Sequence, residues 1–161
     1  MIAVKIVLVT AMLFACAVAL AQQSQGAPPE QRENFDPSRD AAKDIQAALR
    51  QAEASGRRVI LDVGGEWCIW CRRLDSLFAS HPEIEEYRRA HFVTVKVNWS
   101  PENKNEQVLS HYPKVAGYPH LFVLESDGTL LKSQDTGELE KGKGHDPEKV
   151  MAFLKKWAPS K

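Results

Sequence analysis

The amino-acid sequence predicts an α/β fold in which a mixed central sheet of about four strands is flanked by helices. Apolar, β-rich segments alternate along the chain with segments whose apolar residues recur at helical spacing. This alternation implies a parallel strand pair joined by a crossover helix, and a Ser126-Asp127-Gly128 turn adds an antiparallel hairpin. The 161 residues, 43% of them hydrophobic, suit one domain with a substantial core.

The first helix and the first strand are expected to follow the segment "FDPSRD". Asp36 can cap a helical turn and Pro37 suits the first helical position, so a helix should start here. Gly56 is available for the left-handed conformation that commonly ends a helix. "VILDV", Val59 to Val63, is a short apolar run typical of a central strand, although an acid inside it is unusual. The next helix should start at or near Cys68, because the apolar residues that follow share one helical face.

The middle of the chain continues the alternation of helix and strand. "HPEIEEYRRA" predicts either a continuation of the helix beyond a kink at Pro82 or a second short helix. Phe92 to Asn98 alternates apolar and polar residues, as a strand does. "EQVLSHY" predicts one or two helical turns. A strand is expected from about His120 to Glu125, with "TLLKSQD" as its hairpin partner.

The last part of the expected domain is a connector followed by a helix. The segment "GELEKGKGH", residues 137–145, is expected to be a mobile connector. The Asp146-Pro147 pair then repeats the helix-start pattern. An apolar helix face for the core follows it: Val150, Met151, Phe153, Leu154 and Trp157.

The first 21 residues predict a secretory signal peptide rather than part of the fold. A short basic start ends at Lys5, an apolar run covers Ile6 to Leu20, and small residues precede a cleavage position after Ala21. Residues 22–35 are rich in Gln, Pro and Ser, which is typical of a flexible leader. Residues 36–161 are therefore expected to form the domain.

Two alternatives compete with cleavage of the signal peptide. An uncleaved anchor is disfavoured because the apolar run is shorter than the roughly 20 residues that span a bilayer. Lipidation at Cys16 is less favoured because Phe14 is bulky for a lipoprotein cleavage box. We therefore expect an exported protein, periplasmic or secreted. The formal net charge of zero gives no bulk electrostatic attraction to nucleic acid or to an anionic membrane surface.

Cys68 and Cys71, three positions apart in "GGEWCIWC", are the two cysteines that follow the signal peptide. Export is a context in which disulfides persist and thiol exchange is useful. At a helix N-terminus, unpaired N–H groups and the helix dipole favour an anion, so the pKa of the Cys68 thiol should fall. We expect Cys68 to be the exposed nucleophile and Cys71 the shielded, resolving thiol.

Other uses of a cysteine pair are less favoured by the sequence. Structural zinc needs four ligands, commonly from two such pairs. Covalent haem needs a histidine directly after the second cysteine, where this chain has Arg72. A purely structural disulfide over so small a loop would constrain little chain. A binding module that holds a soft metal such as Cu(I) between the two thiols is the alternative from a different functional class.

The segment "VILDVGGEWCIWCRR" resembles the active-site region of thioredoxin-like proteins. Asp62 stands six residues before Cys68, where these proteins carry a buried acid, and Lys96 in "VTVKVN" matches a lysine that approaches this acid. "VAGYPHLFVL" resembles the segment that holds their cis-proline, here Pro119, and "SDGTLL" matches the hairpin after it. The resemblance covers about residues 40–157. The Trp-Cys-X-Trp-Cys form and the signal peptide are most similar to exported thiol:disulfide interchange proteins, such as the C-terminal domain of the transmembrane thiol reductase and its single-domain relatives.

The resemblance implies a thioredoxin-like fold and a thiol-disulfide oxidoreductase. Cys68 and Cys71 would form a redox-active disulfide, and no bound cofactor or metal would be needed. Asp62 would accept a proton from Cys71, because burial raises the pKa of a carboxyl group. Lys96 would moderate that increase in pKa.

The same resemblance implies a substrate-binding surface made of Trp67, Trp70, Tyr118 and Pro119. The chain departs from cytoplasmic thioredoxin in this region. It has Ile69 and Trp70 between the cysteines instead of Gly-Pro, Tyr118 before the proline, and an insert at residues 100–105. The choice of substrate therefore does not follow from the family.

The expected function is reduction of disulfides in exported proteins, with electrons supplied by a membrane or periplasmic redox partner. We expect a monomer that exchanges with protein thiols and disulfides. Ile69 and Trp70 offer neither a charge nor a strong donor to sulfur, which favours a reducing rather than a strongly oxidising pair. A disulfide oxidant or isomerase, and the Cu(I)-binding module, are the alternatives.

Overall fold

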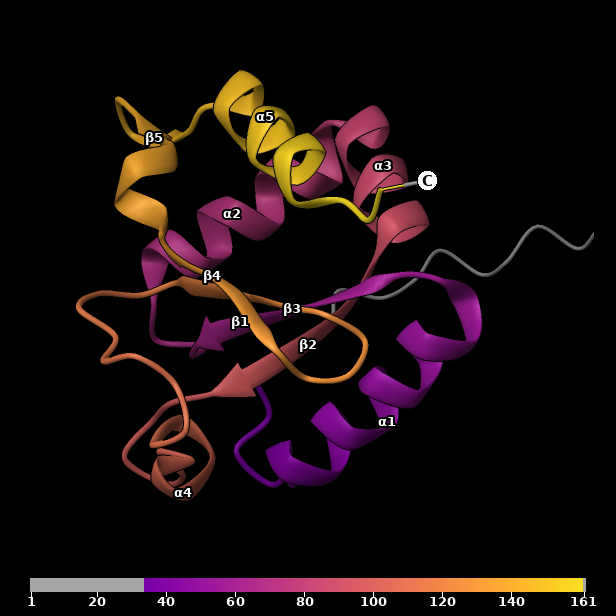
Figure 1. Cartoon of the computed structure of the whole chain (residues 1–161). Coiled ribbons are helices and arrows are strands. Elements are labelled where there is room, and N and C mark those ends of the chain that lie inside the picture. The colour runs from indigo at the N-terminus through magenta and orange to yellow at the C-terminus, as the bar shows by residue number, and fades with distance from the viewer. Residues whose placement is uncertain (1–33, 161) are drawn as a thin grey trace, which may run out of the picture. The chain divides into compact units, whose positions relative to one another are not determined.

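Residues 34–160 are described by a computed structural model, in which helices cover both faces of a four-stranded mixed sheet (Figure 1). The strand order is β2-β1-β3-β4, so β2 and β4 are the edges. The central strand β1 (Arg58–Gly64) runs parallel to β2 (Phe92–Asn98) and antiparallel to β3 (His120–Leu124), and β3 pairs with β4 (Leu130–Asp135). The expected fold class is confirmed.

The helices lie on the sheet in two layers because the strand side chains alternate between its faces. Helix α1 (Ala41–Ser55) covers one face, and α2 (Ile69–Ser80), α3 (Pro82–His91) and α5 (Pro147–Trp157) lie on the other (Figure 1). The buried side chains of β1 follow this division. Val59, Leu61 and Val63 pack in the α1 layer, whereas Ile60 packs with α2, α3 and α5.

Several predicted boundaries are confirmed because local signals set them. Strand β2 has the expected limits, and α2 begins directly after Cys68, which is its N-cap. Pro82 occupies the first turn of a separate helix, α3, so the two-helix alternative is correct. The segment after residue 105 forms one short helix, α4 (Glu106–Leu109).

The predicted start of the first helix is wrong: the helix begins four residues later than expected. Asp36 does not cap the helix; its carboxylate accepts hydrogen bonds from the Ser38 N–H and hydroxyl at 2.8 and 2.7 Å and closes a turn. Asp40 is the true N-cap and accepts from the Lys43 N–H at 3.2 Å. Two Asp residues four positions apart offer the same local signal, and the turn uses the first of them.

The segment expected to be a mobile connector is structured. It contains a 3-10 helix, η1 (Thr136–Leu139), and two short paired strands, β5 (Glu140–Lys141) and β6 (Gly144–His145). Gly142 makes the tight turn between them with a φ of +63°. Leu139 is buried with α2 and α5, and this burial fixes a segment whose composition is that of a loop.

Some sequence predictions concern residues outside the described part of the chain. They are the signal peptide, the lipidation alternative at Cys16 and residues 22–33 of the predicted leader. Among residues 34–160, the structure contains no helix that combines the length and the apolar character needed to cross a membrane.

Candidate active site

Cys68 and Cys71 lie where β1 turns into α2. They form a disulfide with Cα atoms 5.3 Å apart. Cys68 is the N-cap of α2, and its Sγ accepts a hydrogen bond from the Cys71 N–H at 3.1 Å. A sulfur at this position lies at the positive end of the helix dipole, which would stabilise a Cys68 thiolate in the reduced pair.

Two glycines let the turn pass close to the disulfide and to the side chain of Trp67. A Cβ atom on Gly64 would lie 2.5 Å from the Cys71 Sγ and 3.0 Å from Cζ of Phe35. A Cβ atom on Gly65 would lie 2.3 Å from Nε1 of Trp67. Both distances are too short for a Cβ atom. The backbone can therefore lie this close to the Cys71 sulfur and the Trp67 ring only because these two residues are glycine.

Both sulfurs are buried in the disulfide form. Cys68 is 4% exposed and Cys71 is 1% exposed. The expected exposure of Cys68 concerns the reduced pair and stays a prediction. Phe35 packs against the pair, and Trp70 and Tyr118 cover it further. Phe35 lies in the segment predicted to be a leader, and its burial was not foreseen.

Asp62 and Lys96 form a buried ion pair on the face of the sheet that carries α2. The two residues are register partners on β1 and β2, and Lys96 Nζ lies 2.7 Å from Asp62 Oδ2. Asp75 on α2, which the sequence analysis missed, accepts a second hydrogen bond from the same Nζ at 2.5 Å. Asp75 is four residues after Cys71 and therefore on the same face of the helix.

The environment of these groups changes their pKa values in a way that suits proton transfer. Burial raises the pKa of Asp62; the Lys96 charge opposes this increase and the Asp75 charge adds to it. Burial would lower the pKa of Lys96, but the two carboxylates outweigh it, so its pKa is raised and the ammonium stays charged. Asp62 Oδ1 is buried without a hydrogen-bond partner.

An aromatic cluster of Trp67, Trp99 and Tyr118 lies beside the disulfide. Tyr118 stacks on Trp99 with ring centroids 4.9 Å apart, and Trp67 meets both rings edge to face. Trp67 Nε1 also donates to the Trp99 carbonyl at 2.8 Å. Trp67 is nevertheless 53% exposed. Trp99 was missed by the sequence analysis, and its only signal is its position directly after β2.

The predicted substrate-binding residues make different ring contacts. Trp67 meets Tyr118 edge to face, whereas Trp70 meets His145 edge to face and has the Arg73 guanidinium over its ring. The Tyr118–Pro119 peptide bond is cis, as the resemblance implied. The Pro119 carbonyl accepts a hydrogen bond from the Thr136 hydroxyl at 2.5 Å.

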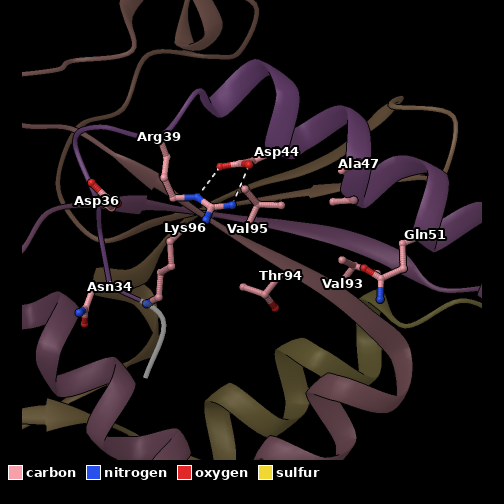
Figure 2. Close-up of a pocket in the computed structure, with 11 residues that line it drawn as sticks. Asn34, Asp36, Arg39, Asp44, Ala47, Gln51, Val93, Thr94, Val95 and Lys96 are labelled. Atoms are coloured by element: carbon pink, nitrogen blue, oxygen red, sulfur yellow. Dashed lines mark hydrogen bonds and ion pairs between the residues drawn. The ribbon is translucent and has the colours of Figure 1, made fainter. Parts of the chain in front are cut away.

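A separate pocket of about 350 Å³ lies along the open edge of β2, next to α1 (Figure 2). Arg39 and Asp44 form a bidentate ion pair at its rim, and Thr94 and Lys96 point away from α1. Neither cysteine and none of the aromatic cluster lines it. Its link to the candidate active site is Lys96, which lines the pocket and pairs with Asp62.

No group of three or more His, Cys, Asp or Glu side chains that could hold a metal ion occurs within the described residues. The alternative considered above was a module that binds Cu(I) through the two thiols alone. In this structure, these two cysteines form a disulfide.

Comparisons with known proteins agree with the geometry of the site. A family model described as thioredoxin-like matches residues 40–126. The chain belongs to the thioredoxin-like family. The cis bond at Pro119 and the disulfide at the start of α2 lie where the resemblance placed them.

Individual relatives of this thioredoxin-like chain carry thiol-disulfide names. The thiol:disulfide interchange protein DsbD of Pseudomonas fluorescens is 28% identical over 73% of this chain, which spans 19% of that protein. The disulfide bond reductase DsbH of Chlamydia pneumoniae is 26% identical over 42% of this chain and 45% of its own length. A solved disulphide isomerase from Xylella fastidiosa superposes with a TM-score of 0.67, at 24% identity, over 76% of this chain and 94% of its own. The chain is thus similar to thioredoxin-like thiol-disulfide oxidoreductases and spans less than half of the curated relatives named here.

Proposed function

We propose that this thioredoxin-like thiol-disulfide oxidoreductase reduces disulfides in exported proteins. The observation that carries the proposal is the Cys68–Cys71 pair at the N-terminus of α2, beside an exposed tryptophan that can contact a polypeptide. The predicted signal peptide supports an exported location, periplasmic or secreted. The names of the DsbD and DsbH relatives support interchange and reduction, respectively.

The proposed reaction transfers two electrons in two exchange steps. The Cys68 thiolate attacks one sulfur of the substrate disulfide, forming a mixed disulfide and releasing the other substrate sulfur as a thiolate. Cys71 then gives its proton to the Asp62 carboxylate, and its sulfur attacks Cys68. The second substrate sulfur leaves as a thiolate and both substrate thiolates take up protons. The protein ends with the Cys68–Cys71 disulfide, and a partner dithiol in the membrane or periplasm would reduce it again.

The residues around the pair suit these roles. Burial that raises the pKa of Asp62 makes its carboxylate a better proton acceptor for a thiol. Lys96 holds this carboxylate and Asp75 together, so the proton acceptor keeps a fixed position. Tyr118 packs against the cysteines and precedes the buried Pro119, which supports the proposal that a substrate backbone lies beside these two residues.

The reduction potential tests the direction of the proposed reaction. Equilibration of the protein with a glutathione redox buffer should give a value nearer the roughly −270 mV of thioredoxin than the roughly −120 mV of strong oxidants of this fold. A value above about −170 mV, beyond that of disulfide isomerases, would reject the reductase and favour the oxidant or isomerase. Stoichiometric Cu(I) binding by the reduced protein without disulfide reduction would instead favour the metal-binding module.

A further inference from the structure

An apolar groove lies next to the active site, between the start of the domain and the insert that follows β2. We define it by the five apolar side chains that line it: Phe35, Pro37, Trp67, Trp99 and Pro101. Its volume is about 570 Å³, within the range of pockets that bind small ligands or side chains. Trp67 lines the groove and directly precedes Cys68 in the sequence. The groove is therefore continuous with the proposed site of exchange.

Hydrogen bonds hold the two walls of the groove in place. In the insert, Asn98 Nδ2 donates to the Asn103 carbonyl at 2.7 Å, and Ser100 and Asn103 exchange two backbone hydrogen bonds. Asn103 Nδ2 donates across to the Pro37 carbonyl at 2.9 Å, which ties the insert to the opposite wall. Glu66 accepts from the Phe35 N–H at 2.9 Å. A groove built in this way loses little conformational freedom when it is filled.

The charged side chains that line the groove are acidic. Glu66 and Glu102 line it, and none of the described residues that line it is a lysine or an arginine. The exposed carboxylate of Glu102 therefore favours a partner with positive charge at this end of the groove.

We propose that the apolar groove binds a large apolar side chain of the substrate polypeptide, close in sequence to the substrate cysteine, with a basic residue beside it at the acidic rim. The occupant is an extended segment of an exported protein. At about 3.3 Å per residue, the apolar side chain would lie some two to four residues from the cysteine held at Cys68. This inference rests on the proposed function and adds a sequence preference to it.

The test measures how fast Cys68 captures short peptides. Each peptide carries one cysteine as a mixed disulfide with glutathione, in the series Lys-Phe-Ala-Cys, Lys-Ala-Ala-Cys and Glu-Phe-Ala-Cys. The reduced chain carries Cys71→Ser, so the peptide stays bound to Cys68 and is quantified by mass spectrometry. We expect the Phe peptide to be captured about tenfold faster than the Ala peptide, because a phenyl side chain becomes largely buried. The Lys peptide should exceed the Glu peptide by roughly threefold.

Matched variants assign these preferences to the groove. Trp67→Ala should bring the Phe-to-Ala ratio close to one, and the ratio cancels any change in the reactivity of Cys68. Ile69→Ala is the control, because Ile69 is 49% exposed next to the same disulfide but does not line the groove; it should keep the ratio. Glu102→Lys, on the exposed rim, should reverse the Lys-to-Glu preference without depending on the fold around Trp67.

A wild-type Phe-to-Ala ratio near one would overturn the inference. A ratio that survives Trp67→Ala, or that falls equally in Ile69→Ala, would also overturn it, because recognition would then lie elsewhere. Capture of oxidised glutathione by the same protein separates this failure from failure of the proposed function. If the chain captures glutathione without peptide preference, only the inference falls; if it captures neither, both fall.

Discussion

At the scale of single residues, the proposed mechanism depends on the buried charges of Asp62 and Lys96. Asp62 has one oxygen on Lys96 and one oxygen with no partner, and Lys96 also holds Asp75. A carboxylate in such a site is ionised only at a cost in free energy, so it takes up a proton readily. The site therefore predicts two effects of replacing this carboxylate, one on rate and one on stability.

Asp62→Asn should slow disulfide exchange by about tenfold or more at neutral pH, because Cys71 loses its proton acceptor. The measurement is the rate at which the mixed disulfide on Cys68 is resolved, from pH 6 to pH 9. Asp44→Asn makes the same chemical change at a carboxylate of the α1 ion pair and should leave the rate unaltered. Equal rates for Asp62→Asn and the natural protein across this range would remove Asp62 from the mechanism.

The same substitution should change how stability depends on pH. The folded state raises the pKa of Asp62 above its unfolded value of about 3.9, so the folded protein resists ionisation and loses stability as the pH rises through this interval. Asn does not titrate, so Asp62→Asn should gain stability relative to the natural protein between pH 4 and pH 8. The sign of this gain follows from the direction of the pKa increase. Denaturant unfolding of the oxidised forms at both pH values measures it, and a relative loss would reverse the sign we assign.

At the scale of the elements, the turn from β1 to α2 brings the backbone against the disulfide. Gly64→Ala would place a methyl group 2.5 Å from the Cys71 Sγ. We expect a loss of about 1–3 kcal/mol in the free energy of unfolding, as for an overpacked core. Gly117→Ala is the matched control, since its Cβ would meet nothing within 4 Å. Similar denaturation midpoints for the two variants would contradict the close approach.

The start of α2 also assigns different roles to the two sulfurs. Because Cys68 is the N-cap and accepts the Cys71 N–H, the Cys71→Ser variant should accumulate mixed disulfides with substrate, and Cys68→Ser should not. Brief alkylation of the reduced protein near neutral pH should label Cys68 first. Trapping by Cys68→Ser would mean that the roles are exchanged.

The sequence predicted those elements whose signals are local. The limits of β2 follow from the alternation of apolar and polar residues, and the start of α2 follows from its apolar face. Asp62, Lys96, Cys68 and Cys71 were identified because their spacing matches a family pattern, and the structure brings Asp62 and Lys96 together.

Other parts of the site depend on contacts that no local signal records. Phe35 stands at the end of a Gln-, Pro- and Ser-rich segment, yet it is buried against the cysteines. Asp75 has the sequence appearance of a solvated helix acid until the fold places Lys96 next to it. Trp99 is one aromatic residue after a strand, and its role depends on Tyr118, 19 positions later in the sequence. Burial of Leu139 likewise orders a segment whose Gly and Lys content is typical of a loop.

At the scale of the whole molecule, Arg58 on β1 connects the end of the C-terminal helix to the sheet through hydrogen bonds. Arg58 Nη1 donates to the carbonyls of Trp157 and Ala158 at 2.9 and 3.0 Å, and its other nitrogens bond to Glu125. Arg58→Gln should lower the free energy of unfolding by about 2 kcal/mol, since these are hydrogen bonds from a charged donor. The rate of disulfide exchange should not change, because Arg58 begins the strand whose other end carries the active site. A decrease in rate with unaltered stability would contradict this division.

The packing of Phe35 against the cysteines has a practical consequence for anyone who attaches this domain to something else. Phe35, near the start of the domain, lies beside the disulfide. The last residue of α5, Trp157, is instead hydrogen-bonded to Arg58, at the far end of the seven-residue strand β1. At about 3.3 Å per residue, that separation is roughly 20 Å. A fluorophore, an affinity handle or a surface linkage placed after the last helix would leave the reactive face open to large protein partners. The same attachment placed just before Phe35 would stand in their way.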